Sequence, residues 1–200
     1  MFGTLFNYFC HSIQQNMHQK KNILLTLVAF ILVAGLYRII PGRPLGFAPQ
    51  IAMALFAGAA ITNKKYAFAI PLVSMLIGDL VFELLYQSGL SAFGGFYEGQ
   101  FLNYLLFAGM TAFGFLINTT KISQIIAGTF AAPTAYFLIS NFAVWISGGG
   151  FNRPKTFEGL MTAYVDGIPF YQGSLVATMI FSAIFFGTFI VSKKNIVAAA

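Results

Sequence analysis

The sequence predicts an all-α fold, a polytopic membrane protein with six transmembrane helices in one bundle. Of its 200 residues, 58% are hydrophobic and 8% are charged, whereas charged residues make up about 25% of a typical soluble domain. The apolar runs are long and do not alternate with polar residues, which excludes the pattern of a transmembrane β-barrel. Because lipid offers the backbone no hydrogen-bond partners, helices are then the structure that can cross the bilayer.

Six hydrophobic runs are predicted as helices, and most reach the roughly 20 residues that cross a hydrocarbon core. They cover Asn22–Ile40, Ala48–Thr62, Tyr66–Gln87, Phe101–Asn118, Ile122–Ser147 and Gly173–Ser192. The second run is short and follows Pro44 and Pro49, residues suited to a loop and to the first turn of a helix. We expect residues 1–21 to form a cytoplasmic or interfacial leader, residues 22–194 the membrane domain and residues 195–200 a short cytoplasmic tail.

Positive charge predicts the orientation of these helices. Seven lysines fall on one side of the six-helix layout: Lys20, Lys21, Lys64, Lys65, Lys121, Lys193 and Lys194. Cytoplasmic loops carry an excess of positive residues, so both termini are expected in the cytoplasm, and the chain in a bacterial cytoplasmic membrane. The acids then all fall in the outer half or outside: Asp79, Glu83, Glu98, Glu158 and Asp166.

The outer connections are longer than the inner turns and are rich in glycine, proline and aromatic residues, a composition common in loops that carry binding residues. In the last of them, apolar residues recur at helical spacing: Phe157, Leu160, Met161, Tyr164, Val165 and Ile168. This periodicity predicts an amphipathic helix lying across the outer mouth of the bundle.

Two acids lie inside the third predicted helix, in "MLIGDLVFELLY". Asp79 and Glu83 are four residues apart and share one helix face, where two like charges disfavour each other. A rise of about 1.5 Å per residue brings Arg38 to a similar depth. An acid at the bilayer centre costs about 2.5 to 3.5 kcal/mol, so we expect these acids to pair with Arg38 or Arg43. Such a pair either lines a solute site or only fixes the fold, as buried ion pairs often do.

Further polar residues at this depth favour a solute site. We expect substrate-binding roles for Arg38, Arg43, Asp79, Glu83, Asn103, Asn141 and Trp145. Gln87 continues the row of the two acids, and Tyr104 follows Asn103. Trp145 also suits the interfacial position where tryptophans anchor membrane helices.

Patterns for catalysis or metal binding are weak. The one cysteine, Cys10, lies near His11 and His18 at spacings too loose for a zinc site. An intramembrane aspartyl protease needs a second aspartate facing Asp79, and no other predicted span contains one. The chain has no phosphate-binding loop. We therefore expect no catalytic residues, no metal, no cofactor and no nucleic-acid partner.

Three segments carry a resemblance to a known family: "RIIPGRPLGFAPQIAMALFAGA", "AFAIPLVSMLIGDLVFEL" and "SNFAVWISG". They resemble an uncharacterised bacterial membrane family related to the substrate-binding S components of energy-coupling factor (ECF) transporters. The resemblance implies a binder of a vitamin-like micronutrient that works with a transmembrane T component and two cytoplasmic ATPases. S components dock through an A-x-x-x-A face in the first helix, but here Val33 follows Ala29. Ala54 and Gly58 offer small residues at the same spacing in the second helix, suited either to such docking or to packing within the bundle.

Two other functions remain open at this point. An ion- or proton-coupled secondary carrier would use Asp79 and Glu83 as a relay. A membrane scaffold without a solute would use the same charges for architecture alone.

Overall fold

The computed structural model describes residues 31–32, 34–37, 40, 42–148 and 153–198, and within them it contains helices, turns and loops but no strand. The named helices are α2 (Gln50–Ala60), α3 (Lys64–Gln87), α4 (Gln100–Gly114), α5 (Ile122–Ser147) and α6 (Phe157–Ala198). Residues 31–32 and 34–37 are also helical. The predicted all-α fold is confirmed for this part of the chain. The predicted leader, and the Ala29 and Val33 positions, lie outside the described residues.

Three of the described helices are long and apolar enough to cross a membrane: α3, α5 and residues Phe157–Val191 of α6. The helices α2 and α4 have 11 and 15 residues. At about 1.5 Å per residue they span only about 16 and 22 Å, short of a hydrocarbon core about 30 Å thick. The prediction that both are full transmembrane spans is therefore wrong, and the described residues provide three candidate spans rather than six.

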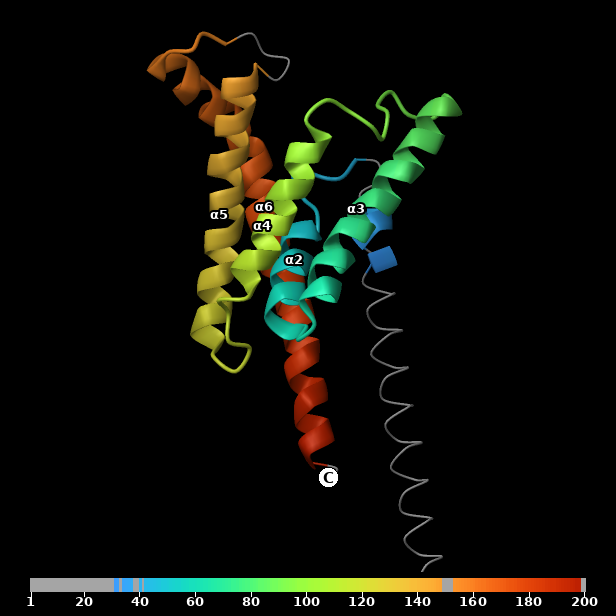
Figure 1. Ribbon diagram of the computed structural model, residues 1–200, viewed down its shortest axis with the longest axis vertical. Coiled ribbons are helices and arrows are strands. Elements are labelled where there is room, and N and C mark those ends of the chain that lie inside the picture. Colours follow the sequence, from blue (N-terminus) through green and yellow to red (C-terminus); the bar gives the residue numbers. More distant parts are fainter. Residues whose placement is uncertain (1–30, 33, 38–39, 41, 149–152, 199–200) are drawn as a thin grey trace, which may run out of the picture.

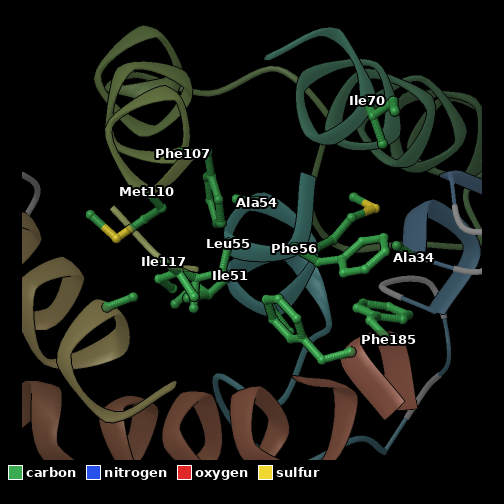
Figure 2. Close-up of a cluster of buried hydrophobic side chains, with 14 of the residues drawn as sticks. Ala34, Ile51, Ala54, Leu55, Phe56, Ile70, Phe107, Met110, Ile117 and Phe185 are labelled. Carbon is green, nitrogen blue, oxygen red and sulfur yellow. The ribbon is translucent and has the colours of Figure 1, made fainter. Parts of the chain in front are cut away.

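The short helix α2 forms the centre of the structure (Figure 1). Every residue from Gln50 to Gly58 is buried, which is the pattern of a helix enclosed on all sides. Pro49 occupies its N-cap, and the Pro49 carbonyl accepts the hydrogen bond of the Met53 amide at 2.9 Å. Figure 2 shows side chains of α3, α4 and α6, among them Ile70, Phe107 and Phe185, around this helix.

Helices α2 and α4 approach each other at two glycines. A Cβ on Gly58 would come within 2.1 Å of the Thr111 carbonyl oxygen, and a Cβ on Gly114 within 2.5 Å of the Leu55 carbonyl oxygen. Small residues permit such close contact between helix backbones in apolar surroundings. Gly58, considered above as part of a docking face, therefore packs inside the bundle.

The connections alternate between the two ends of the bundle. Figure 1 places the α2–α3 and α4–α5 turns at the lower end and the α3–α4 connection at the upper end, where α5 ends and α6 begins. This arrangement agrees with the predicted grouping of short turns and longer connections.

The helix α6 differs from its prediction. Instead of an amphipathic helix followed by a separate span, Phe157–Ala198 is one helix with Pro169 inside it. Its first turns are inclined to the rest in Figure 1, as expected near an internal proline. The residues buried in these turns are Gly159, Ala163 and Gly167, because close approach to its neighbours requires small side chains. The predicted apolar row instead includes side chains that remain exposed, such as Phe157 and Val165.

Candidate functional site

The two acids of α3 lie at the upper end of the bundle, where the connection to α4 folds back over the helix. Asp79 is 1% exposed. Its Oδ2 accepts hydrogen bonds from the Tyr104 hydroxyl at 2.7 Å and from Gln100 Nε2 at 2.8 Å. Both donors are on α4, so the buried carboxylate joins α3 to the first turns of α4.

Glu83, one turn further along α3, is only half-buried. Its Oε1 accepts from Gln87 Nε2 at 3.0 Å, and its Oε2 accepts from the Gly95 amide at 3.0 Å. The hydrogen bond from Gln87 agrees with the predicted row of polar residues along this face. Neutral donors therefore hold both oxygens of this carboxylate in place.

Gly95 connects the two acids. Its carbonyl oxygen accepts a second bond from Gln100 Nε2 at 3.3 Å, the same nitrogen that donates to Asp79. A Cβ at this position would lie 1.7 Å from the Asp79 carbonyl oxygen and 2.8 Å from the Glu83 amide nitrogen. Only a glycine lets the connection lie this close to the main chain of α3. We call Asp79, Glu83, Gly95, Gln100 and Tyr104 the acid cluster.

Asn103 on α4 links the α3–α4 connection to α5. Its Nδ2 donates to the Tyr97 hydroxyl oxygen at 2.7 Å, and its Oδ1 accepts from the Tyr136 hydroxyl at 2.6 Å. The side chain thus fixes the ring of Tyr97 in the connection relative to α5. The predicted site residue Asn103 lies on α4 between Gln100 and Tyr104, the two donors to Asp79, and its own described hydrogen bonds are to tyrosines.

An open hollow of about 590 Å³ lies beside the acid cluster. Its lining comes from the last turns of α3 and from the connection that follows: Glu83, Tyr86, Ala92, Phe93, Gly94, Phe96 and Tyr97. Glu83 is the residue shared by the hollow and the acid cluster. Pockets that hold small ligands typically have volumes of about 300 to 1,000 Å³.

Of the two arginines predicted to pair with the acids, Arg38 lies outside the described residues. Arg43 donates from Nη1 to the Phe47 carbonyl oxygen at 3.2 Å. Its loop lies against α6, where Ser174 Oγ donates to the Gly46 carbonyl oxygen at 3.0 Å. A Cβ on Gly173 would come within 1.9 Å of the Leu45 carbonyl oxygen. The loop is therefore fitted tightly onto α6.

Asn141 and Trp145 have described contacts on the α6 side of α5. The Asn141 side chain lies against Gly167, whose Cβ would be 2.4 Å from Asn141 Oδ1. Trp145 Nε1 donates to the Pro154 carbonyl oxygen at 3.0 Å, and Lys155 Nζ lies 5.6 Å from the centre of the indole ring. These contacts fasten the beginning of α6 to the end of α5, whereas the described partners of Asp79 and Glu83 are on α3, α4 and their connection.

Sequence reasoning missed Gly95, Gln100, Tyr97 and Tyr136. The sequence offered one signal for this group, the adjacent glycines in "AFGGFYEGQ". Neighbouring glycines often mark a close backbone approach, but they do not identify the surface that is approached. The tyrosines had no such signal, because hydroxyl partners are set by how the helices pack.

Among the described residues, no group of three or more His, Cys, Asp or Glu side chains could hold a metal ion. The half-buried carboxylate of Glu83 shares its hollow with several aromatic rings.

Comparison with known proteins gives a family but no activity. No match to the chain was found among curated proteins or among solved structures. One family model, described as a family of unknown function (DUF6580), matches residues 18–199. The chain, over nearly all of its length, thus belongs to the DUF6580 family of unknown function.

Proposed function

We propose that this chain is a membrane-embedded binding protein that captures a small water-soluble molecule in the hollow at the upper end of α3. The observation that carries the proposal is the set of hydrogen bonds at Gly95. Its amide donates to Glu83, and its carbonyl accepts from Gln100, which also donates to Asp79, so the loop lining the hollow is attached to both acids of α3. A loop fastened in this way is preorganised, which lowers the entropic cost of ordering it around a ligand.

In this proposal Glu83 contacts the solute and Asp79 positions the loop. Glu83 lines the hollow and is half-buried, whereas Asp79 is fully buried and its described bonds go to Gln100 and Tyr104. Asn103 supports Tyr97 from behind. Asn141 and Trp145 instead attach the beginning of α6 to the end of α5.

The membrane setting of the proposal follows the lysine distribution and the resemblance to S components of ECF transporters. α3, α5 and α6 would cross a bacterial cytoplasmic membrane, the upper end would face outwards and the termini would lie in the cytoplasm. The solute would be a vitamin-like micronutrient. A transmembrane T component with cytoplasmic ATPases would supply the energy for its release inside.

The test is to identify what the protein retains. The full chain, purified from membranes of its native host, is washed and denatured, and the released small molecules are measured by mass spectrometry. We expect one molecule in near-stoichiometric amount, absent from an unrelated membrane protein purified in parallel. Ala92→Trp would fill the hollow and abolish retention, while Ala131→Trp, at an exposed position on α5, would not. Equal retention by both variants, or no retained molecule at all, would refute the proposal.

The energy source separates this proposal from an ion-coupled carrier. Uptake that requires a partner ATPase and persists with a proton uncoupler supports the S-component type of mechanism. Uptake by the purified chain alone, in liposomes under an ion gradient, would instead assign the acids of α3 to a carrier.

A further inference from the structure

The hollow has a specific chemical character that narrows the class of solute. Four aromatic rings line it: Tyr86 on α3, and Phe93, Phe96 and Tyr97 on the connection. Among the described residues that line it, Glu83 is the one charged side chain and none is basic. The described lining is therefore a carboxylate among aromatic rings.

The carboxylate of Glu83 retains capacity for a ligand. Its described donors are the Gln87 side-chain amide on Oε1 and the Gly95 backbone amide on Oε2, and the Phe96 backbone also hydrogen-bonds the carboxylate. A carboxylate offers about four acceptor sites, so these three bonds fix the rotamer and still leave acceptor capacity. Because all three donors are neutral, they orient the negative charge of Glu83 but do not neutralise it.

The aromatic rings add attraction of the same sign. The faces of aromatic rings are electronegative, and a cation within about 6 Å of a ring centre is attracted to it. Asn103 holds the Tyr97 ring through its hydroxyl, and Asn103 is itself held by Tyr136. Tyr86 is part of α3, so at least two of the rings are positioned by helices rather than by the loop alone.

We infer that the hollow binds an organic cation, a molecule with a quaternary or aromatic-ring nitrogen carrying positive charge. This inference rests on the proposed function and specifies its solute. An anion would face the carboxylate of Glu83, and the described part of the lining offers it no basic group. A neutral molecule would cover the carboxylate without compensating its charge, which is costly. A metal ion would have one acidic ligand, since the described residues provide no cluster of ligating side chains there.

The test uses three probes that share one ring and differ in charge: 1-methylnicotinamide (cation), nicotinamide (neutral) and nicotinate (anion). Binding of each to the purified full chain in lipid nanodiscs is measured by isothermal titration. We expect the cation to bind at least about tenfold more tightly than nicotinamide, a difference of about 1.4 kcal/mol, and nicotinate to bind most weakly.

Substitutions in the lining test whether the preference for the cation arises in the hollow. Glu83→Gln should lower the affinity for 1-methylnicotinamide about tenfold and leave that for nicotinamide unchanged, because it removes the charge and keeps an acceptor for the Gly95 amide. Phe96→Leu should also weaken the binding of 1-methylnicotinamide, since it replaces an aromatic ring by an aliphatic side chain. Glu98→Gln is the control, because Glu98 is an exposed acid in the same connection but outside the lining. Unfolding temperatures close to that of the wild type show that the variants are folded.

The outcomes separate the two proposals. If a neutral or anionic probe binds as tightly as the cation, or if the retained molecule is neutral or anionic, the inference is wrong while the proposed function stands. If no probe binds at millimolar concentration and no molecule is retained, both are wrong. A cation preference that is unaffected by Glu83→Gln would also overturn the assignment to this hollow.

Discussion

Gly95 lies directly against the main chain of Asp79, because a Cβ at position 95 would be 1.7 Å from the Asp79 carbonyl oxygen. The connection between α3 and α4 is consequently in van der Waals contact with α3 at the point where both acids project. The amide and carbonyl groups of Gly95 then complete the contact by bonding Glu83 and Gln100. The position of the loop that lines the hollow therefore depends on the glycine at position 95.

Gly95→Ala is expected to destabilise the protein. The added methyl group would force the connection away from α3, and overpacking of this kind typically costs about 1 to 3 kcal/mol. The unfolding temperature of the purified chain in detergent should fall. Gly109→Ala is the matched control, since Gly109 is on α4 and a Cβ there meets nothing within 4 Å. An equal effect of the two substitutions would contradict the close contact at Gly95.

The bond between Asp79 and Tyr104 is testable with a double-mutant cycle. Tyr104→Phe removes a donor to a buried carboxylate, and hydrogen bonds to charged groups contribute about 1.5 to 3 kcal/mol. Asp79→Leu removes the acceptor. We expect the double variant to be more stable than the sum of the single losses predicts, by at least about 0.5 kcal/mol in the free energy of unfolding.

The control for this cycle is Tyr66→Phe, which alters a tyrosine that is 64% exposed on α3. It should leave stability unchanged and combine additively with Asp79→Leu. Additive losses for Asp79 and Tyr104 themselves would show that they are not energetically coupled.

The crossing of α2 and α4 predicts a strong effect of Gly58→Ala. A Cβ on Gly58 would lie 2.1 Å from the Thr111 carbonyl oxygen, so the two helix backbones would have to separate. Because α2 is at the centre of the core, we expect a loss of more than about 1 kcal/mol in stability. Gly187→Ala, on α6 with open space around it, is expected to be neutral. Unfolding curves for the pair provide the measurement, and a tolerated Gly58→Ala would be evidence against this packing.

The orientation in the membrane is checked by labelling single cysteines in intact cells. In a Cys10→Ser background, Glu98→Cys and Thr156→Cys should react with a membrane-impermeant maleimide added outside, whereas Thr62→Cys and Thr119→Cys should not. Glu98 belongs to the α3–α4 connection and Thr156 directly precedes α6, whereas Thr62 and Thr119 belong to the α2–α3 and α4–α5 turns. Figure 1 places that connection and the beginning of α6 at the upper end and the two turns at the lower end. Labelling of Thr62→Cys or Thr119→Cys from outside would invert the orientation and place the hollow in the cytoplasm.

Several features of the site were accessible from the sequence because they depend on local spacing. Asp79, Glu83 and Gln87 follow one helix face, and the structure shows Gln87 bonded to Glu83. The sequence also placed Asn103 near the start of the helix that carries Gln100 and Tyr104. Its partners Tyr97 and Tyr136 were not, since they are six residues before it and 33 residues after it in the chain. Such pairings depend on how the helices are arranged, and helical spacing carries no information on that.

The sequence by itself determined the class of this protein. Its low charge content and long apolar runs predict helices apolar enough to cross a membrane, because the cost of placing charges and unpaired backbone groups in lipid acts on each segment separately. The tertiary structure decided which helices are long. α2 ends after 11 residues and lies buried in the centre, whereas the last predicted span and the segment before it join into α6. An apolar residue buried against another helix has the same hydropathy as one facing lipid, so only the packing at Gly58, Gly95 and Gly167 distinguishes them.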